Sequence, residues 1–174
     1  MYDEMSGLRD SVKAKKVTIA FSTMTGNTAK VAQKLEEGLK ASGADTYVFN
    51  LKNANLDEVL NRIQASDGVL IGSSTKYGDM VGNVEELLQA LEKIDVNGKL
   101  AAAFGSYGWS GEAITHAEDY LDRAGFNVVN QRYLIANRGV DTMLFPLRVK
   151  FSREEGLNTA KEAGRIFGEQ ILIK

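Results

Sequence analysis

Short apolar runs alternate with amphipathic segments along the chain, and this alternation constrains the fold more than any other feature. The runs predict strands at residues 17–21, 47–49, 68–72, 100–104 and 126–134. The segments between and after them have apolar residues at helical spacing, and predict helices near residues 28–40, 56–63, 84–91, 113–124 and 152–171. Continuous apolar strands indicate burial on both faces, and strands alternating with helices indicate right-handed βαβ units. The predicted architecture is a three-layer α/β sandwich around a five-stranded parallel sheet.

The chain of 174 residues has the length of one domain, predicted to span residues 16–174 after an N-terminal extension of residues 1–15. An insert around residues 136–146 interrupts the last part of the pattern, and residues 147–151 are expected to continue the strand structure. Gly43, Gly98 and Gly125 fall between helices and strands, where C-cap glycines are common.

Composition excludes several classes of protein. No apolar run is long enough to cross a membrane, and the polar N-terminus does not resemble a secretory signal, so we expect a cytoplasmic protein. The chain has no cysteine and a single histidine, His116, which leaves little material for iron–sulfur clusters, other metal sites or catalytic triads. A net charge of -2 without a basic stripe argues against nucleic acid as a partner. Redox chemistry would therefore need an organic cofactor.

The loop after the first strand is rich in hydroxyl groups and has no charge. It consists of Ser22, Thr23, Met24, Thr25, Gly26, Asn27 and Thr28. Hydroxyls and free backbone N–H groups at the start of a helix form a phosphate site. The alternative is that Thr25 or Asn27 simply caps the helix. Neither the P-loop pattern nor the dinucleotide pattern is present, so a single phosphate is the better fit.

The loop after the fourth strand carries the only tryptophan, Trp109, in a glycine-rich segment. The segment includes Gly105, Ser106, Tyr107, Gly108 and Gly111. A tryptophan outside any periodic apolar pattern, at a loop tip, is more typical of a ligand platform than of a core.

Residues 19–35 resemble the flavodoxin signature, with Phe21, Thr23, Gly26, Thr28 and Leu35 at matching positions. Ala32 also matches, whereas Ala20 departs from the larger residue that is usual in the strand. The resemblance extends over about residues 15–171. The loop after the fourth strand, called the third loop below, is similar to the third flavin loop of clostridial-type flavodoxins and of the flavodoxin domain in flavodiiron proteins.

The resemblance implies a sheet of order 2-1-3-4-5 with FMN bound at the carboxyl ends of the strands. It implies that Trp109 stacks on the isoalloxazine ring. It also identifies a second flavin loop, which contains Ser74, Thr75, Tyr77, Gly78 and Asp79. Asp79, Glu85 and Glu112 lie near these loops, either as charges close to the flavin or as solvated carboxylates at helix starts.

The function implied is that of an electron carrier, which shuttles single electrons between protein redox partners, a reductase and an acceptor, as a monomer or weak dimer. We expect no enzymatic activity, because no catalytic dyad is visible. Two alternatives stay open. One is an FMN-dependent NAD(P)H:quinone reductase on the same fold, and the other is an electron donor to a flavodiiron-like partner.

Overall fold

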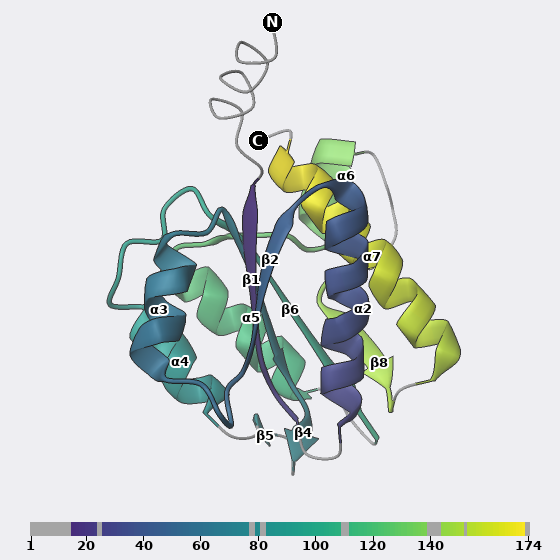
Figure 1. The fold of residues 1–174 in the computed structure, drawn as a ribbon, viewed down its shortest axis with the longest axis horizontal. Helices are drawn as coiled ribbons and strands as arrows, with labels where there is room; N and C mark the ends of the chain where they lie inside the picture. Colours follow the sequence, from purple (N-terminus) through teal and green to yellow (C-terminus); the bar gives the residue numbers. More distant parts are fainter. Residues whose placement is uncertain are drawn as a thin grey trace, which may run out of the picture.

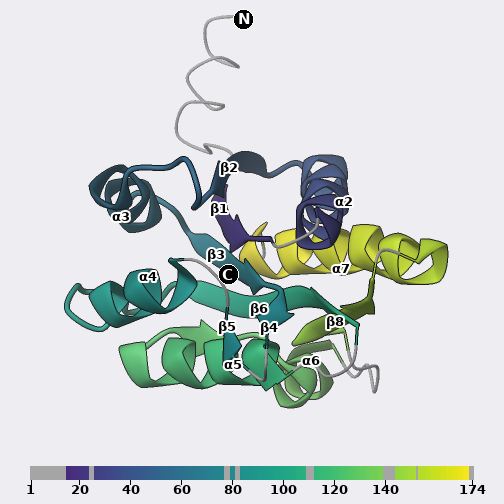
Figure 2. The ribbon, with the colours of Figure 1, turned by 90° about the horizontal axis from the view of Figure 1, so that it is seen from below.

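A parallel sheet runs through the middle of the molecule, with helices on both of its faces (Figures 1 and 2). The structure is a computed structural model and describes residues 15–23, 26–76, 79–80, 83–108, 112–138, 144–151 and 153–172. The predicted extension therefore lies outside the described residues, apart from Lys15. Within the described ranges, no helix is long and apolar enough to cross a bilayer.

The main sheet contains six strands: β1 (Lys16–Ser22), β2 (Asp45–Asn50), β3 (Gly68–Ser73), β6 (Leu100–Tyr107), β7 (Asn127–Val128) and β8 (Leu147–Lys150). The helices are α2 (Asn27–Ser42), α3 (Leu56–Gln64), α4 (Val84–Leu91), α5 (Glu112–Ala124), α6 (Gln131–Arg138) and α7 (Glu154–Leu172). The strands follow the order β2-β1-β3-β6-β7, and β8 also pairs with β6. All these pairings are parallel. This is the predicted order 2-1-3-4-5, with the fifth strand in two pieces.

Two apolar clusters fill the space between the sheet and its helices. One joins the sheet to α2 and α7 and contains Val31, Leu35 and Phe167. The other joins the opposite face to α3, α4 and α5 and contains Val59, Leu88 and Ile114. Because both faces are covered, β3 is buried along its whole length, as its continuous apolar run predicts.

Helices α2 and α7 pack closely through glycines on both sides. A Cβ at Gly38 would collide with the carbonyl oxygen of Lys161, and one at Gly164 would collide with that of Leu35. At each of these two points, the backbone of one helix approaches a glycine of the other.

The prediction of one strand over residues 126–134 is wrong in its second half. Strand β7 ends at Val128, and the chain then forms α6. Asn130 explains the change, because its side-chain oxygen accepts the N–H of Tyr133 at 2.9 Å, as an N-cap residue does. Leu134 is buried in the first apolar cluster. The insert therefore begins as a packed helix, and strand pairing resumes at β8, as predicted.

The predicted roles of the three glycines hold for two of them. Gly43 is the C-cap of α2 in the left-handed region, and Gly125 follows α5 with a φ of 105°. Gly98 also has a positive φ, but it lies beyond the end of α4 in the turn before β6. It is therefore a turn glycine and not a helix cap.

Candidate functional site

The carboxyl ends of β1, β3 and β6 lie side by side at one edge of the sheet. Ser22 at the end of β1 is in register with Ser73 at the end of β3, and Gly72 is in register with Phe104 of β6. Ligands of open α/β sheets bind at this edge, where the strand order reverses. The three loops singled out in the sequence thus leave the sheet next to one another.

Three buried hydroxyl groups join these loops. The Oγ1 atom of Thr28 lies 2.7 Å from Oγ of Ser74 and 2.7 Å from Oγ of Ser106. The two serine oxygens are 3.4 Å apart. All three side chains are buried. The structure therefore brings together one predicted residue from each of the three loops.

Ser22 carries a buried hydroxyl of a different kind. Its Oγ atom is inaccessible to solvent and has no hydrogen-bond partner among the described residues. An unpartnered buried polar group is costly, about 1–3 kcal/mol, so such groups are uncommon in folded proteins. Ser22 lies at the end of β1, at the edge of the sheet where the three loops begin.

The start of α2 has no side-chain cap. Gly26 is the N-cap residue with a φ of 88°, a left-handed conformation that suits glycine. Its N–H donates to Oγ1 of Thr23 at 3.0 Å. The first helical turn contains no acidic residue. Asn27 lies within the helix, so the alternative that Asn27 is the cap is wrong, and Thr25 lies outside the described residues.

The third loop begins with two crowded glycines. A Cβ at Gly105 would collide with the carbonyl oxygen of Ser73, so glycine permits the close approach of β6 to β3. Tyr107 ends β6, and its carbonyl oxygen accepts the N–H of Phe151 at 2.7 Å. The Phe151 ring lies against Gly108 and is 48% exposed.

Sequence reasoning gave Phe151 no role at the site. The structure places it at the carboxyl end of β8, beside the third loop, with a φ of 54°. The only available signal was an aromatic residue at the end of a strand run, which does not distinguish a core residue from a site residue.

The second loop begins as a small hairpin. Strand β4 (Thr75–Lys76) pairs antiparallel with β5 (Asp79–Met80), and α5 lies next to both. Met24, Thr25, Tyr77, Gly78, Trp109 and Gly111 lie outside the described residues, as do the side chains of Thr75 and Asp79. Their predicted contacts with the flavin stay predictions.

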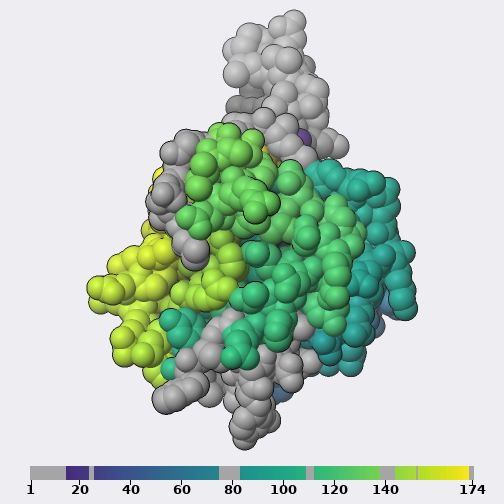
Figure 3. All heavy atoms as spheres, turned by 180° about the vertical axis from the view of Figure 1, so that it is seen from behind, coloured from purple at the N-terminus to yellow at the C-terminus, as the bar shows by residue number. Residues whose placement is uncertain are grey.

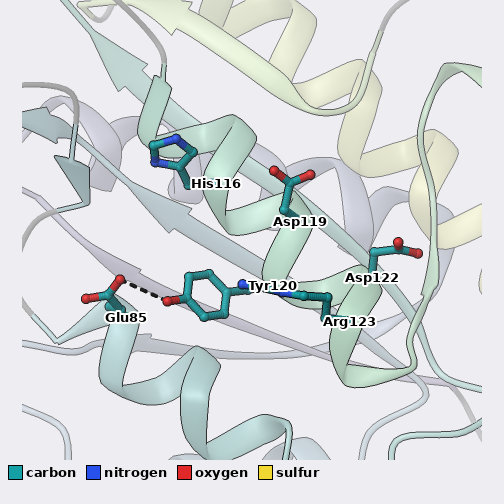
Figure 4. A pocket seen from close by; sticks show the side chains of 6 residues that line it. All are labelled: Glu85, His116, Asp119, Tyr120, Asp122 and Arg123. Carbon is teal, nitrogen blue, oxygen red and sulfur yellow. Dashed lines mark hydrogen bonds between the residues drawn. The ribbon is translucent and has the colours of Figure 1, made fainter.

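A hollow of about 550 Å³ lies between α4 and α5, and none of the described residues that line it is among those predicted to hold the cofactor. Its lining includes Glu85, His116 and Arg123, and Tyr120 donates a hydrogen bond to Glu85 at 3.0 Å (Figure 4). From behind, α5 and α6 form a continuous surface next to α7 (Figure 3).

Glu85 and Glu112 are exposed in the first turns of α4 and α5, which fits the interpretation as helix-start carboxylates.

Sequence comparison identifies relatives among larger redox proteins. A type A flavoprotein from Rhodobacter capsulatus is 40% identical over 109 residues, which cover 62% of this chain and 25% of the relative. An anaerobic nitric oxide reductase flavorubredoxin from Pectobacterium atrosepticum is 33% identical over 119 residues, 67% of this chain and 23% of the relative. The chain thus spans about a quarter of the length of the curated relatives it matches.

Solved structures agree with the fold. A flavodoxin from the domain Archaea superposes with a TM-score of 0.73 at 26% identity, covering 90% of this chain and 98% of that one. The flavodiiron core of Flv1 from Synechocystis gives a TM-score of 0.77 at 28% identity, covering 98% of this chain and 39% of that one. The family model described as Flavodoxin matches residues 19–164. Since this match spans most of the chain, the chain belongs to the flavodoxin family.

Proposed function

We propose that this chain is a one-electron carrier that binds FMN at the carboxyl edge of its sheet. The observation that supports this most is the set of buried hydroxyls of Thr28, Ser74 and Ser106, which joins three loops beside the unpartnered hydroxyl of Ser22. A cofactor that spans all three loops fits this arrangement. The bound FMN supplies the redox chemistry, and the chain's residues bind and orient it.

The first loop holds the phosphate in this proposal. Its hydroxyls and backbone N–H groups are neutral donors, and the positive end of the α2 dipole favours an anion by about 0.3–2 kcal/mol, depending on burial. The absence of acidic residues from the first turn of α2 fits an anionic ligand. The residues involved are Ser22, Thr23, Met24, Thr25, Gly26, Asn27 and Thr28.

The second and third loops hold the isoalloxazine ring, with Trp109 stacked on its outer face. The close approach of Gly105 to Ser73 brings the bases of these two loops together, which supports a single shared ligand. The residues involved are Ser74, Thr75, Tyr77, Gly78, Asp79, Gly105, Ser106, Tyr107, Gly108, Trp109 and Gly111.

The partners are redox proteins, and a flavodiiron-type protein is the acceptor that the relatives favour. Matched relatives are a nitric oxide reductase flavorubredoxin and flavodiiron proteins, each much longer than the matching segment. One histidine and no cysteine give this chain little material for a metal centre of its own. An electron-transfer role alongside a metal-bearing partner fits both facts.

Two measurements test this function. Mass spectrometry of flavin released from the purified protein should identify FMN, and recovery of FAD, or no binding by the apoprotein, would contradict the cofactor assignment. Anaerobic stepwise reduction should then show two separate one-electron steps in the absorbance spectrum. Rapid steady-state oxidation of NAD(P)H with a quinone by the pure protein would instead support the quinone reductase alternative.

A further inference from the structure

Strand β2 forms one edge of the main sheet and lies between α3 and α2 (Figures 1 and 2). The N–H groups of Asp45 and Leu51 donate to the carbonyl oxygens of Lys15 and Phe21, each at 2.8 Å, so both groups face β1. Since alternate residues of a strand face opposite neighbours, the N–H and C=O groups of Thr46 and Val48 point away from β1. The Val48 side chain is also exposed, at 40%.

We propose that this edge pairs with β2 of a second copy of the chain, in antiparallel orientation, so that the sheets of two copies become continuous. Open strand edges are templates for such pairing. The two-fold axis passes through Val48, which brings its exposed side chain against its own counterpart.

The central pair of this register uses backbone groups that face away from β1. Val48 and its counterpart form a hydrogen-bonded pair, which exchanges two N–H···O=C bonds. The N–H of Asn50 then meets the carbonyl oxygen of Thr46 in the other copy. The carbonyl oxygen of Asn50 already accepts the N–H groups of Asn53 and Ala54, so this outer pair makes one of its two possible bonds and the ladder ends there.

Charged side chains flank the edge on both faces of the sheet. On one face, Glu36 accepts a hydrogen bond from Thr46 and lies 3.5 Å from Lys40. On the other face, the Arg62 guanidinium lies 4.0 Å above the Tyr47 ring, and Glu58 lines the same groove.

In the proposed register Asp45 lies opposite residue 51 of the other copy, next to Lys52, and both charged residues are exposed. Opposite charges facing each other in this way select the antiparallel mate and disfavour other orientations.

The geometry leaves both functional sites open. Because the paired strands run in opposite directions, the carboxyl edges of the two sheets face opposite ends of the dimer. Each proposed FMN site therefore stays accessible to its redox partner, and dimerisation does not depend on the cofactor assignment.

A cysteine cross-link tests the register directly. The chain has no cysteine, so Val48→Cys introduces the only thiol. Residues in a hydrogen-bonded antiparallel pair have Cα atoms about 5.5 Å apart, which suits a disulfide. We expect Val48→Cys to convert largely to a disulfide-linked dimer under mild oxidation. Ile135→Cys, at an exposed apolar position on α6, should stay mostly monomeric under the same conditions.

Sedimentation equilibrium of the full chain, with and without flavin, provides the second measurement. The wild-type protein should approach the mass of a dimer as its concentration rises. Val48→Lys should weaken dimerisation by about tenfold or more, because it removes two buried valines and opposes two like charges. Ile135→Lys should dimerise as the wild-type protein does. A wild-type protein that stays monomeric, a dimer unaffected by Val48→Lys, or equal cross-linking of the two cysteine variants would overturn the proposal.

Discussion

The hydroxyl oxygen of Thr28 lies 2.7 Å from that of Ser106, although the two residues are 78 positions apart in the chain. Thr28 stands in the first turn of α2 and Ser106 near the end of β6, and both are buried. Their contact fixes the start of α2, which follows the first loop, against the end of β6, where the third loop begins. The site is thus partly assembled by the protein's own hydrogen bonds, which lowers the ordering cost of binding a ligand.

Replacing Thr28 by valine should destabilise the apoprotein, because valine keeps the shape of threonine and loses the hydroxyl. We expect the free energy of unfolding to fall by about 1–3 kcal/mol, the usual cost of breaking a buried hydrogen bond. Urea denaturation measures the change. Thr159→Val is the matched control, since Thr159 is exposed on α7 and its hydroxyl donates to the carbonyl oxygen of Glu155, one turn earlier in the same helix. The control should change stability by less than about 0.5 kcal/mol, and equal losses would contradict the role given to Thr28.

Ser22→Ala should separate stability from cofactor binding. The Ser22 hydroxyl is buried without a described partner, so its removal should leave the apoprotein as stable as before, or more stable. If the hydroxyl binds the phosphate, FMN affinity should fall by about 10- to 150-fold, which corresponds to about 1.5–3 kcal/mol. Fluorescence titration with FMN and with riboflavin measures this difference. Equal losses for both flavins would show that the variant disturbs the site without a phosphate contact.

Much of the fold follows from the sequence, because five strands with continuous apolar runs leave few other architectures. The run at residues 126–134 misled the prediction, since Val128 and Val129 favour a strand up to the point where Asn130 starts a helix. That choice depends on Leu134 reaching the core, which is a tertiary contact. Local patterns do not contain it.

The candidate site was predictable in outline and not in detail. The strand order 2-1-3-4-5 alone brings the three loops to one edge, so their convergence could be expected. The role of Thr28 could not, since a threonine at a strand–helix turn serves equally well as a cap, a ligand or a link between loops. Distances between residues far apart in the chain decide among these roles.

Trp109 is predicted to stack on the flavin, and this residue lies outside the described part of the structure. Stacking contributes about 0.5–1.5 kcal/mol beyond burial, and lost burial adds more, so Trp109→Ala should weaken FMN binding by roughly 10- to 1000-fold. Trp109→Phe should lose less, because a smaller ring keeps part of the contact. As the only tryptophan, it also reports binding directly. Tryptophan fluorescence that is not quenched when the apoprotein takes up FMN would refute the stacking.

Glu118 on α5 should make stability depend on pH. Burial raises the pKa of its carboxyl above the ordinary value of 4.5, although Arg148 partly opposes the shift. One carboxylate oxygen, Oε2, is buried and has no hydrogen-bond partner among the described residues. A raised pKa in the folded state means that the folded protein holds this proton more tightly than the unfolded chain does. This contribution to stability is therefore largest below pH 4.5 and is lost as the pH rises through the folded-state pKa.

Glu118→Gln removes that titration, because the amide stays neutral. The variant should be more stable than the wild-type protein at pH 7, and this advantage should shrink as the pH falls toward 4. Urea denaturation at a series of pH values measures the difference. Glu86→Gln, at an exposed position on α4, is the control and should not reproduce this trend. The opposite result would be a variant that loses stability relative to the wild-type protein as the pH rises from 4 to 7. In that case, attraction between the Glu118 carboxylate and Arg148 would outweigh the cost of burying the charge.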